Sequence, residues 1–334
     1  MKILAGFLIS ITLIKTVFSL NDLARNITQD DKDKNDDPDF PFTTVVDILS
    51  QNVEFSMFLR LIQRQGFIPY LNELQNFTLF VPVNSAFVTT TPDDYQLDIE
   101  KYLLHGYILN TEEFIPGIHI LPEEEFPLML KKSSKGSSSV NDIDIVEPNL
   151  FPNSQDAVVQ GIGAFVGHLP SYQHLIYDLN SKSQSLDLVG ALFNSTFASN
   201  PRLETILQNK TIFLPVDANF LQYFNQVELD YLTGTLFYDE EMAVLKKFKH
   251  SKEWLYDKLF LIKKLVVEGF HGGILPAKDL TNMNGEILEF HTEESGALMV
   301  INGSNSVYSN LVYDKGVVHT FQDLDFLGHG ISFK

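Results

Sequence analysis

The chain contains 334 residues, 44% of them hydrophobic, which favours about two domains with packed cores. Its formal net charge of −19 makes nucleic acids and anionic membranes poor partners, because both bind clustered Lys and Arg. Its lack of cysteine excludes disulfides, thiol catalysis, redox sensing and thiolate metal sites.

The first residues have the pattern of a secretory signal peptide. Lys2 provides a basic start, residues 3–14 form a short apolar run, and residues 17–19 offer small or aliphatic side chains for cleavage. The sequence therefore predicts a signal peptide at residues 1–19. An uncleaved membrane anchor is the alternative.

An acidic run follows at residues 30–39. Its dense charge favours a disordered leader over residues 20–42; a calcium loop is the alternative, but the run lacks the glycine-centred turn of such loops. No later stretch is apolar enough to span a bilayer, and residues 329–334 resemble neither a glycolipid-anchor tail nor a retention signal. We therefore expect no transmembrane segment after signal cleavage, and a location in the secretory pathway, namely the vacuole lumen, the cell wall or the exterior.

Sequons for N-glycosylation are consistent with this route. The chain has five, at Asn26, Asn76, Asn194, Asn209 and Asn302. Because such triplets also arise by chance, they add to the signal-peptide prediction rather than establish it.

A ten-residue phrase occurs twice: residues 78–87 read TLFVPVNSAF and residues 211–220 read TIFLPVDANF. Their separation is about the size of a whole domain, which indicates two copies of one fold. In each copy a short β-rich run ends at a proline, which cannot extend a central strand. An Asn or Asp then provides an N-cap for a helix that carries a phenylalanine inward. The residues with these structural duties are Thr78, Pro82, Asn84 and Phe87 in the first copy and Thr211, Pro215, Asp217 and Phe220 in the second.

The residues around the phrase follow the same order in both copies. From Thr43 onward, apolar residues recur at helical spacing until Gly66, a helix stop. The late part of each copy contains strand-like runs, and residues 131–139, rich in Ser and Lys, favour an exposed loop or hairpin tip. Helices followed by a late set of strands favour an α+β fold over a doubly wound parallel sheet.

The junction between the copies is predicted at Leu169-Pro170. It separates a first domain at residues 43–170 from a second at residues 171–334. Within the second domain, Trp254 lies in an amphipathic stretch, for which a core helix is favoured over a membrane-facing one.

The repeated phrase resembles the first signature of fasciclin-like domains, and residues 316–319 (GVVH) resemble the second, a strand near the end of the domain. In the first copy residues 157–160 (AVVQ) occupy that place, with Gln160 where His319 stands in the second. The resemblance covers residues 43–334. It implies two tandem domains, each a wedge of β-strands packed with several helices, as in short secreted or vacuolar fasciclin-domain proteins of fungi. It also implies a role in adhesion or matrix contact.

Some animal members of this family use a Tyr-His pair in cell adhesion, and this chain departs from that pattern. Its nearest equivalents are Tyr107 in the first copy and Phe270 and His271 in the second. These three residues are the possible interaction sites that the resemblance implies, whereas integrin binding is not carried over.

The sequence contains no recognised catalytic constellation, neither a Gly-x-Ser-x-Gly elbow, nor a His-Glu-x-x-His helix, nor a Gly-rich phosphate loop. His319 stands among apolar strand residues, which favours a hydrogen-bonded structural histidine. The amide at Gln160 in the same place argues against a general base. We therefore expect no enzyme, no catalytic or metal site and no cofactor.

The predicted function is that of a secreted or lumenal glycoprotein acting as a non-enzymatic adhesion or protein-interaction module, with a protein or glycan partner. One alternative is a lumenal carrier of a small apolar ligand or lipid, which would require a contiguous apolar cavity. An unrecognised hydrolase, which would require a Ser or Asp beside a histidine in a cleft, ranks third.

Overall fold

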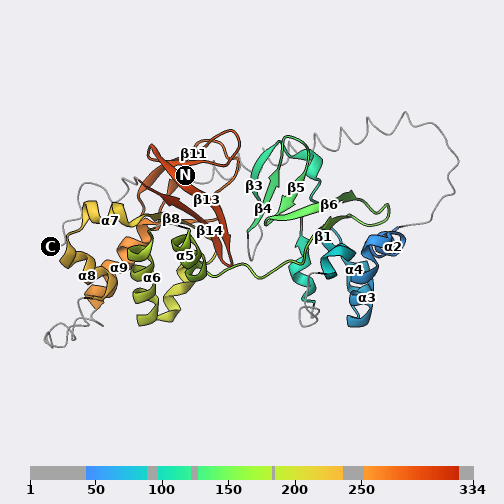
Figure 1. Ribbon diagram of the computed structural model, residues 1–334, viewed down its shortest axis with the longest axis horizontal. Coiled ribbons are helices and arrows are strands. Elements are labelled where there is room, and N and C mark those ends of the chain that lie inside the picture. Colours follow the sequence, from blue (N-terminus) through green and yellow to red (C-terminus); the bar gives the residue numbers. More distant parts are fainter. Residues whose placement is uncertain (1–42, 89–96, 122–126, 183–184, 236–251, 323–334) are drawn as a thin grey trace, which may run out of the picture. The chain divides into compact units, whose positions relative to one another are not determined.

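The computed structural model describes residues 43–88, 97–121, 127–182, 185–235 and 252–322 (Figure 1). The predicted signal peptide, the acidic leader and Asn26 lie outside these residues. Phe42–Lys334 form one compact unit. It contains the same arrangement twice, and we call residues 45–162 the first repeat and residues 172–321 the second repeat.

The first repeat begins with helices whose ends follow from local capping. Thr44 and Asp47 form a reciprocal capping box at the start of the first helix, and Gly66 ends the next one in the left-handed conformation. Phe58 and Ile62 are buried, as the helical spacing predicts. The helical segments are α2 (Val45–Gln51), η1 (Val53–Phe55), α3 (Ser56–Gln65), α4 (Ile68–Glu73), η2 (Asn84–Val88), η4 (Ile99–Tyr102) and η5 (Thr111–Glu113).

The strands of the first repeat form one sheet in the order β2-β1-β7-β6-β5-β4-β3. They are β1 (Phe77–Pro82), β2 (Leu103–His105), β3 (Gly117–Leu121), β4 (Leu128–Lys132), β5 (Ser138–Val140), β6 (Ile143–Leu150) and β7 (Ala157–Ile162). The first and last strands, β1 and β7, pair in parallel, and the other neighbours are antiparallel. Both central strands are buried along their whole length, which suits strands covered on two faces.

The second repeat reproduces this order, with a sheet that runs β10-β11-β12-β13-β14-β8-β9 and a parallel pair of β8 and β14. Figure 1 shows its α-helices gathered on one side of the strands. The segments are α5 (Tyr172–Ser181), α6 (Asp187–Ser199), η6 (Pro201–Leu207), β8 (Lys210–Pro215), α7 (Asp217–Tyr223), α8 (Gln226–Thr233), α9 (Lys252–Lys264), β9 (Val266–Glu268), β10 (Lys278–Thr281), β11 (Ile287–Thr292), β12 (Met299–Ile301), β13 (Ser304–Tyr313) and β14 (Gly316–Phe321). The predicted α+β class with two copies of one fold is confirmed.

Each repeat has its own hydrophobic core. The ring centroids of Phe87 and Phe165 are 4.7 Å apart. Phe220, which ends the phrase in the second repeat as Phe87 does in the first, is also buried. Trp254 on α9 is also buried and donates its indole N–H to the carbonyl of Tyr231 at 2.8 Å, so α9 is a core helix. None of the helices in the described segments combines the length and the apolar character needed to cross a bilayer.

The sequence predicts that Asn84 and Asp217, two residues after the proline of each phrase, cap the helix that follows them. Each caps an earlier helix instead. Asn84 Oδ1 accepts the backbone N–H of Met57 at 3.0 Å, at the start of α3. The carboxylate of Asp217 accepts the backbone N–H of Leu188 at 2.9 Å, at the start of α6. The prediction is wrong because the fold brings the unsatisfied N–H groups of an earlier helix to these side chains.

The two sheets differ at one edge. In the second repeat β10 leads back to β9, where Met283 donates its N–H to the carbonyl of Val266 at 3.0 Å. In the first repeat β3, the counterpart of β10, bonds to the second repeat instead. Ile118 donates its N–H to the carbonyl of Ser295 at 2.9 Å and accepts the N–H of Ile274 at 2.7 Å.

Glycine makes this contact between β3 and the second repeat possible. A Cβ on Gly296 would lie 2.5 Å from the carbonyl carbon of Gly273 and 2.8 Å from the carbonyl oxygen of Ile118. A Cβ on Gly273 would lie 2.5 Å from that same oxygen. Backbones can approach this closely only where side chains are absent.

We expect Phe87→Ala to lower the free energy of unfolding of the first repeat by about 3–5 kcal/mol, because it leaves a cavity in the core. Val88→Ala is the matched control, since the neighbouring Val88 is 84% exposed and its truncation should cost about 0.5 kcal/mol or less. Urea unfolding followed by circular dichroism measures both variants. Equal losses would contradict the core position of Phe87.

Candidate functional site

The threonine that begins the phrase in the first repeat holds the loop after β2. Thr78 Oγ1 donates to the carbonyl of Tyr107 and accepts the N–H of Leu109, both at 2.8 Å. The side chain is fully buried. Its hydroxyl therefore satisfies two backbone groups of the loop that would otherwise lack a partner.

The second repeat uses the same device on the loop after β9. Thr211 Oγ1 donates to the carbonyl of Gly269 and accepts the N–H of His271, again at 2.8 Å each. Thr211 is also fully buried. The threonine of the phrase is thus a clamp between a central strand and the loop beside it in both repeats.

Gln160 on β7 supplies the next contact to the loop of the first repeat. Its Oε1 accepts the N–H of Asn149 at 3.0 Å, and its Nε2 donates to the carbonyl of Leu109 at 2.5 Å. Both polar ends of this buried amide are therefore bonded inside the protein.

His319 on β14 makes the equivalent two contacts in the second repeat. Its Nδ1 accepts the N–H of Asn310 at 3.1 Å, so Nε2 carries the ring hydrogen and donates to the carbonyl of His271 at 2.7 Å. Burial lowers the pKa of His319 to about 4, and the hydrogen bond to the His271 carbonyl only partly opposes this. The imidazole is therefore neutral at pH 7, and both nitrogens are occupied.

Two asparagines complete the network, and sequence reasoning missed them. Asn149 and Asn310 have left-handed backbones, with φ of 57° and 58°, where β6 and β13 shift register. Their Oδ1 atoms accept the N–H groups of Thr111 at 2.9 Å and Gly273 at 2.6 Å. The only signal in the sequence is an Asn-Leu pair ahead of the last strand of each repeat, which is too common to predict this role.

The hydrogen bonds also define how the two loops correspond. Gly106 and Gly269 both have a left-handed backbone. Gly106 donates its N–H to the carbonyl of Asn76 at 2.7 Å, and Gly269 donates its N–H to the carbonyl of Asn209 at 2.9 Å. Leu109 is the third residue after its glycine, whereas His271 is the second, yet both donate to the clamping threonine. His271 is therefore the counterpart of Leu109, and Tyr107 belongs to a loop that is one residue longer.

The three candidate interaction residues differ in exposure. Tyr107 is 38% exposed, and partial burial raises the pKa of its phenol. Phe270 and His271 are half-buried. His271 Nδ1 accepts from Lys278 Nζ at 3.0 Å and Nε2 donates to the carbonyl of Glu268 at 2.7 Å. Burial, together with the Lys278 charge, lowers the pKa of His271 to about 4.

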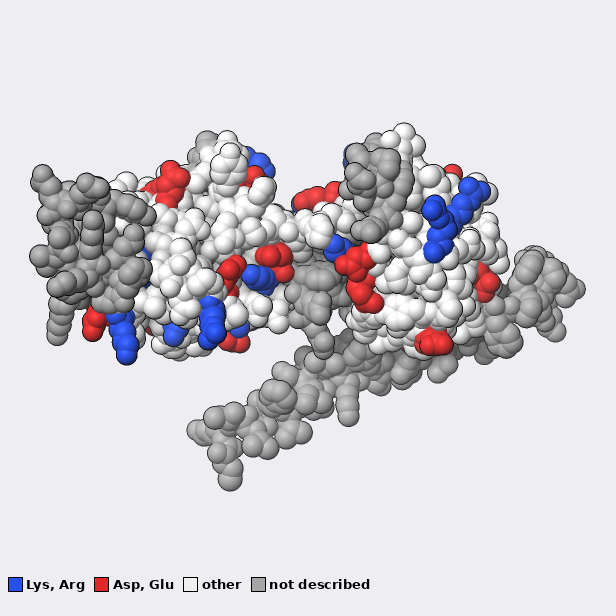
Figure 2. Space-filling model, turned by 90° about the horizontal axis from the view of Figure 1, so that it is seen from below, with Lys and Arg blue, Asp and Glu red and all other residues white. Residues whose placement is uncertain are grey.

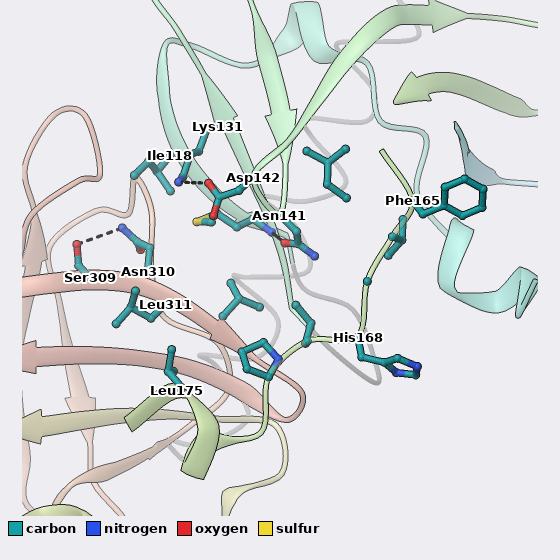
Figure 3. A pocket seen from close by; sticks show the side chains of 17 residues that line it. Ile118, Lys131, Asn141, Asp142, Phe165, His168, Leu175, Ser309, Asn310 and Leu311 are labelled. Atoms are coloured by element: carbon teal, nitrogen blue, oxygen red, sulfur yellow. Dashed lines mark hydrogen bonds and ion pairs between the residues drawn. The ribbon is translucent and has the colours of Figure 1, made fainter. Parts of the chain in front are cut away.

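A cavity of about 450 Å³ lies between β3 and β4 of the first repeat, β13 of the second, and the connecting segment at residues 165–170 (Figure 3). Most of its lining side chains are apolar: Ile118, Met129, Ile143, Phe165, Val166, Leu169, Leu175, Leu311 and Val312. In Figure 3 Lys131 and Asp142 point toward each other at its margin, where they form an ion pair. His168 points away, and its ring contacts Lys101 Nζ at 3.0 Å.

The sequon asparagines within the described segments, Asn76, Asn194, Asn209 and Asn302, are all exposed. The sequons at Asn76 and Asn209 end in Thr78 and Thr211. The hydrogen bonds of these two threonines to the neighbouring loops already explain why threonine stands there. In the same segments no three His, Asp or Glu side chains stand close enough together to hold a metal ion. Figure 2 shows Lys and Arg dispersed among Asp and Glu rather than gathered in one patch on the face seen there.

Thr211→Val should destabilise the second repeat by about 1–3 kcal/mol, because it leaves backbone groups of Gly269 and His271 buried without their partner. Thr211→Ser keeps the hydroxyl and loses one methyl group, which should cost about 0.8 kcal/mol. Trp254, the single tryptophan of the chain, reports unfolding of this repeat in urea. A serine variant as unstable as the valine variant would refute the clamp.

Comparisons with known proteins agree with the architecture. Residues 53–151 match the model of the fasciclin domain family. The chain is 36% identical over 307 residues to a FAS1 domain-containing protein of Saccharomyces cerevisiae, which covers 90% of this chain and 35% of the relative. The chain thus spans about a third of the length of this curated relative.

A solved structure also matches, that of a FAS1 domain pair from the insect cell adhesion molecule fasciclin I. It is 11% identical, covers 82% of this chain and 97% of its own, and has a TM-score of 0.31. From the family match we conclude that the chain contains a fasciclin domain at residues 53–151, and its similarity to the yeast FAS1 domain-containing protein extends over 90% of the chain.

Proposed function

We propose that this protein is a secretory-pathway glycoprotein that acts as a non-enzymatic adhesion or protein-interaction module, in the vacuole lumen, the cell wall or the exterior. Fasciclin domains are associated with adhesion and protein interaction. The predicted signal peptide and sequons support the route.

One observation carries the non-enzymatic part of the proposal: the polar side chains near the repeated phrase form their hydrogen bonds with groups inside the fold. His319 is fully buried and bonded at both ring nitrogens. A general base must instead reach a substrate proton directly or through one water. The network of Thr211, Asn310 and His319 therefore acts on the loop beside it, which it holds to the sheet.

A loop held in this way is suited to binding by surface contact, because a rigid scaffold positions the side chains that the loop exposes. Tyr107 is the exposed candidate in the first repeat. Phe270 and His271 occupy the equivalent loop of the second. We propose these two loops as contact sites for a protein or glycan partner.

The interaction can be tested with the purified chain immobilised on beads and incubated with detergent-solubilised cell-surface and cell-wall fractions. We expect Tyr107→Ala to reduce capture of a specific partner at least tenfold, as is typical of an aromatic contact residue. Tyr177→Ala is the matched control, since Tyr177 is 72% exposed on α5. Undiminished capture by a folded Tyr107→Ala variant would argue against this loop.

Glycosylation gives a direct test of the secretory assignment. Expressed with its native N-terminus in yeast, the protein should migrate faster on a denaturing gel after peptide-N-glycosidase treatment, because the sequon asparagines within the described segments are exposed. Asn194→Gln, at an exposed position on α6, should remove one glycan without disturbing the fold. Unchanged migration after enzyme treatment would contradict passage through the secretory pathway.

The cavity of about 450 Å³ favours a second candidate function, the carriage of a small apolar ligand or lipid. Native mass spectrometry of the purified chain should then detect a bound apolar molecule. Leu311→Trp, which fills the cavity from β13, should abolish this binding, whereas Val307→Trp on the same strand, at a 41% exposed position, should retain it. A ligand-free spectrum and equal binding of fatty acids by both variants would refute carriage in this cavity.

A further inference from the structure

The second repeat contains a pair of histidines, His319 buried and His271 half-buried, that the first repeat replaces with groups that do not titrate. His319 and His271 are joined by a hydrogen bond from the ring of one to the backbone carbonyl of the other, at 2.7 Å. In the first repeat, Gln160 bonds in the same way to Leu109. The chain therefore holds two versions of one network, only one of which can gain protons at mildly acidic pH.

The geometry around His319 leaves no place for a second proton. Its Nδ1 faces the backbone N–H of Asn310 at 3.1 Å. A proton on Nδ1 would put two donors face to face and break this hydrogen bond. It would also place a positive charge at a position with no exposed surface, against the ring of Phe213, whose centroid lies 5.8 Å away.

The surroundings of His271 also disfavour a second proton on its ring. Its Nδ1 faces the ammonium group of Lys278 on β10 at 3.0 Å, so a proton there would meet a positive charge. The other titratable groups on the elements around the loop are the ion pair of Lys210 and Glu268, His119 on β3, and the exposed carboxylates of Asp279 on β10 and of Glu293 and Glu294 in the turn before Gly296. Glu268 is 76% exposed and already bound to Lys210 at 3.1 Å, so it offers little to balance a charge on either histidine.

The loop that these histidines hold also carries the contact with the first repeat. Gly273 forms a β-bridge with His119, and the following residue, Ile274, donates its N–H to the carbonyl of Ile118 at 2.7 Å. Asn310, the partner of His319, also holds Gly273 through its Oδ1 at 2.6 Å. The histidine network and the junction between the repeats thus share the loop at residues 269–274.

We propose that mild acid opens the loop at residues 269–274 of the second repeat and releases its bridge to β3, while the loop of the first repeat stays closed. The trigger is protonation of His319 and His271, and the element that moves is the loop they hold to the sheet. This inference stands on the hydrogen-bond geometry and does not rest on the proposed function.

The sign of the effect follows from linkage. The pKa of His319 is about 4 in the closed state and about 6.5 once the ring is hydrated. The open state therefore binds more protons between these values, and the closed state loses stability as the pH falls from 6.5 toward 4. For His319 alone, acidification from pH 7.5 to 5.0 should raise the equilibrium constant for opening about 30-fold.

Hydrogen–deuterium exchange of the full chain at pH 7.5 and 5.0, corrected for intrinsic exchange rates, tests the proposal. Peptides that contain residues 269–274 should lose protection at least tenfold at pH 5.0, whereas peptides that contain residues 106–112 should not. His319→Gln, which places the glutamine of the first repeat at this position, should reduce this loss. Adding His271→Leu, the counterpart of Leu109, should abolish it. Gln160→His should introduce acid sensitivity into the loop of the first repeat.

Two results would overturn the proposal: equal changes in both loops, or an unchanged acid response in His319→Gln. The fold of each variant is checked at pH 7.5 by circular dichroism and by Trp254 fluorescence. If His319→Gln does not fold, NMR titration of the histidines in the unaltered chain decides the question. Titration of His319 near pH 6.5 with no change in loop protection would be incompatible with the switch.

Discussion

The backbone of one loop in each repeat, partly buried against the sheet, sets the constraint on which the rest of the structure depends. The loop after β2 or β9 presents N–H and carbonyl groups to the interior, where water cannot satisfy them. A threonine hydroxyl, an asparagine amide and a Gln or His side chain bond to these groups instead. The repeated phrase is therefore explained by the duties of its residues within the fold, and Gln160 and His319 are two solutions to one requirement.

The repeats share this network but differ where they meet. In the second repeat β10 returns toward β9, whereas in the first repeat β3 bonds to the loop and turn of its neighbour. Gly273 and Gly296 allow this approach because any Cβ would collide with backbone. The loop that follows β9 thus has two roles, since it completes the second repeat and contacts the first. The corresponding loop of the first repeat is one residue longer and presents Tyr107.

These observations separate the structural from the functional content of the chain. Residues that invite a catalytic reading, above all His319, lie inside the fold with their hydrogen bonds satisfied. The proposed functions therefore use the loops that the scaffold exposes or the apolar cavity where the repeats meet. This division is physically reasonable for a fasciclin-domain protein, because a rigid duplicated scaffold can vary its surface without changing its core.

The sequence by itself determined the duplication, the α+β class, the helix end at Gly66 and the inward phenylalanines, because these follow from composition, spacing and local capping. Only the tertiary structure decided the parallel pairing of the first and last strands, the helices that Asn84 and Asp217 cap, and the roles of Asn149 and Asn310. It also decided that His271 corresponds to Leu109 rather than to Tyr107. The physical reason is that each of these depends on which unsatisfied backbone groups the fold brings to a side chain from a distant part of the chain.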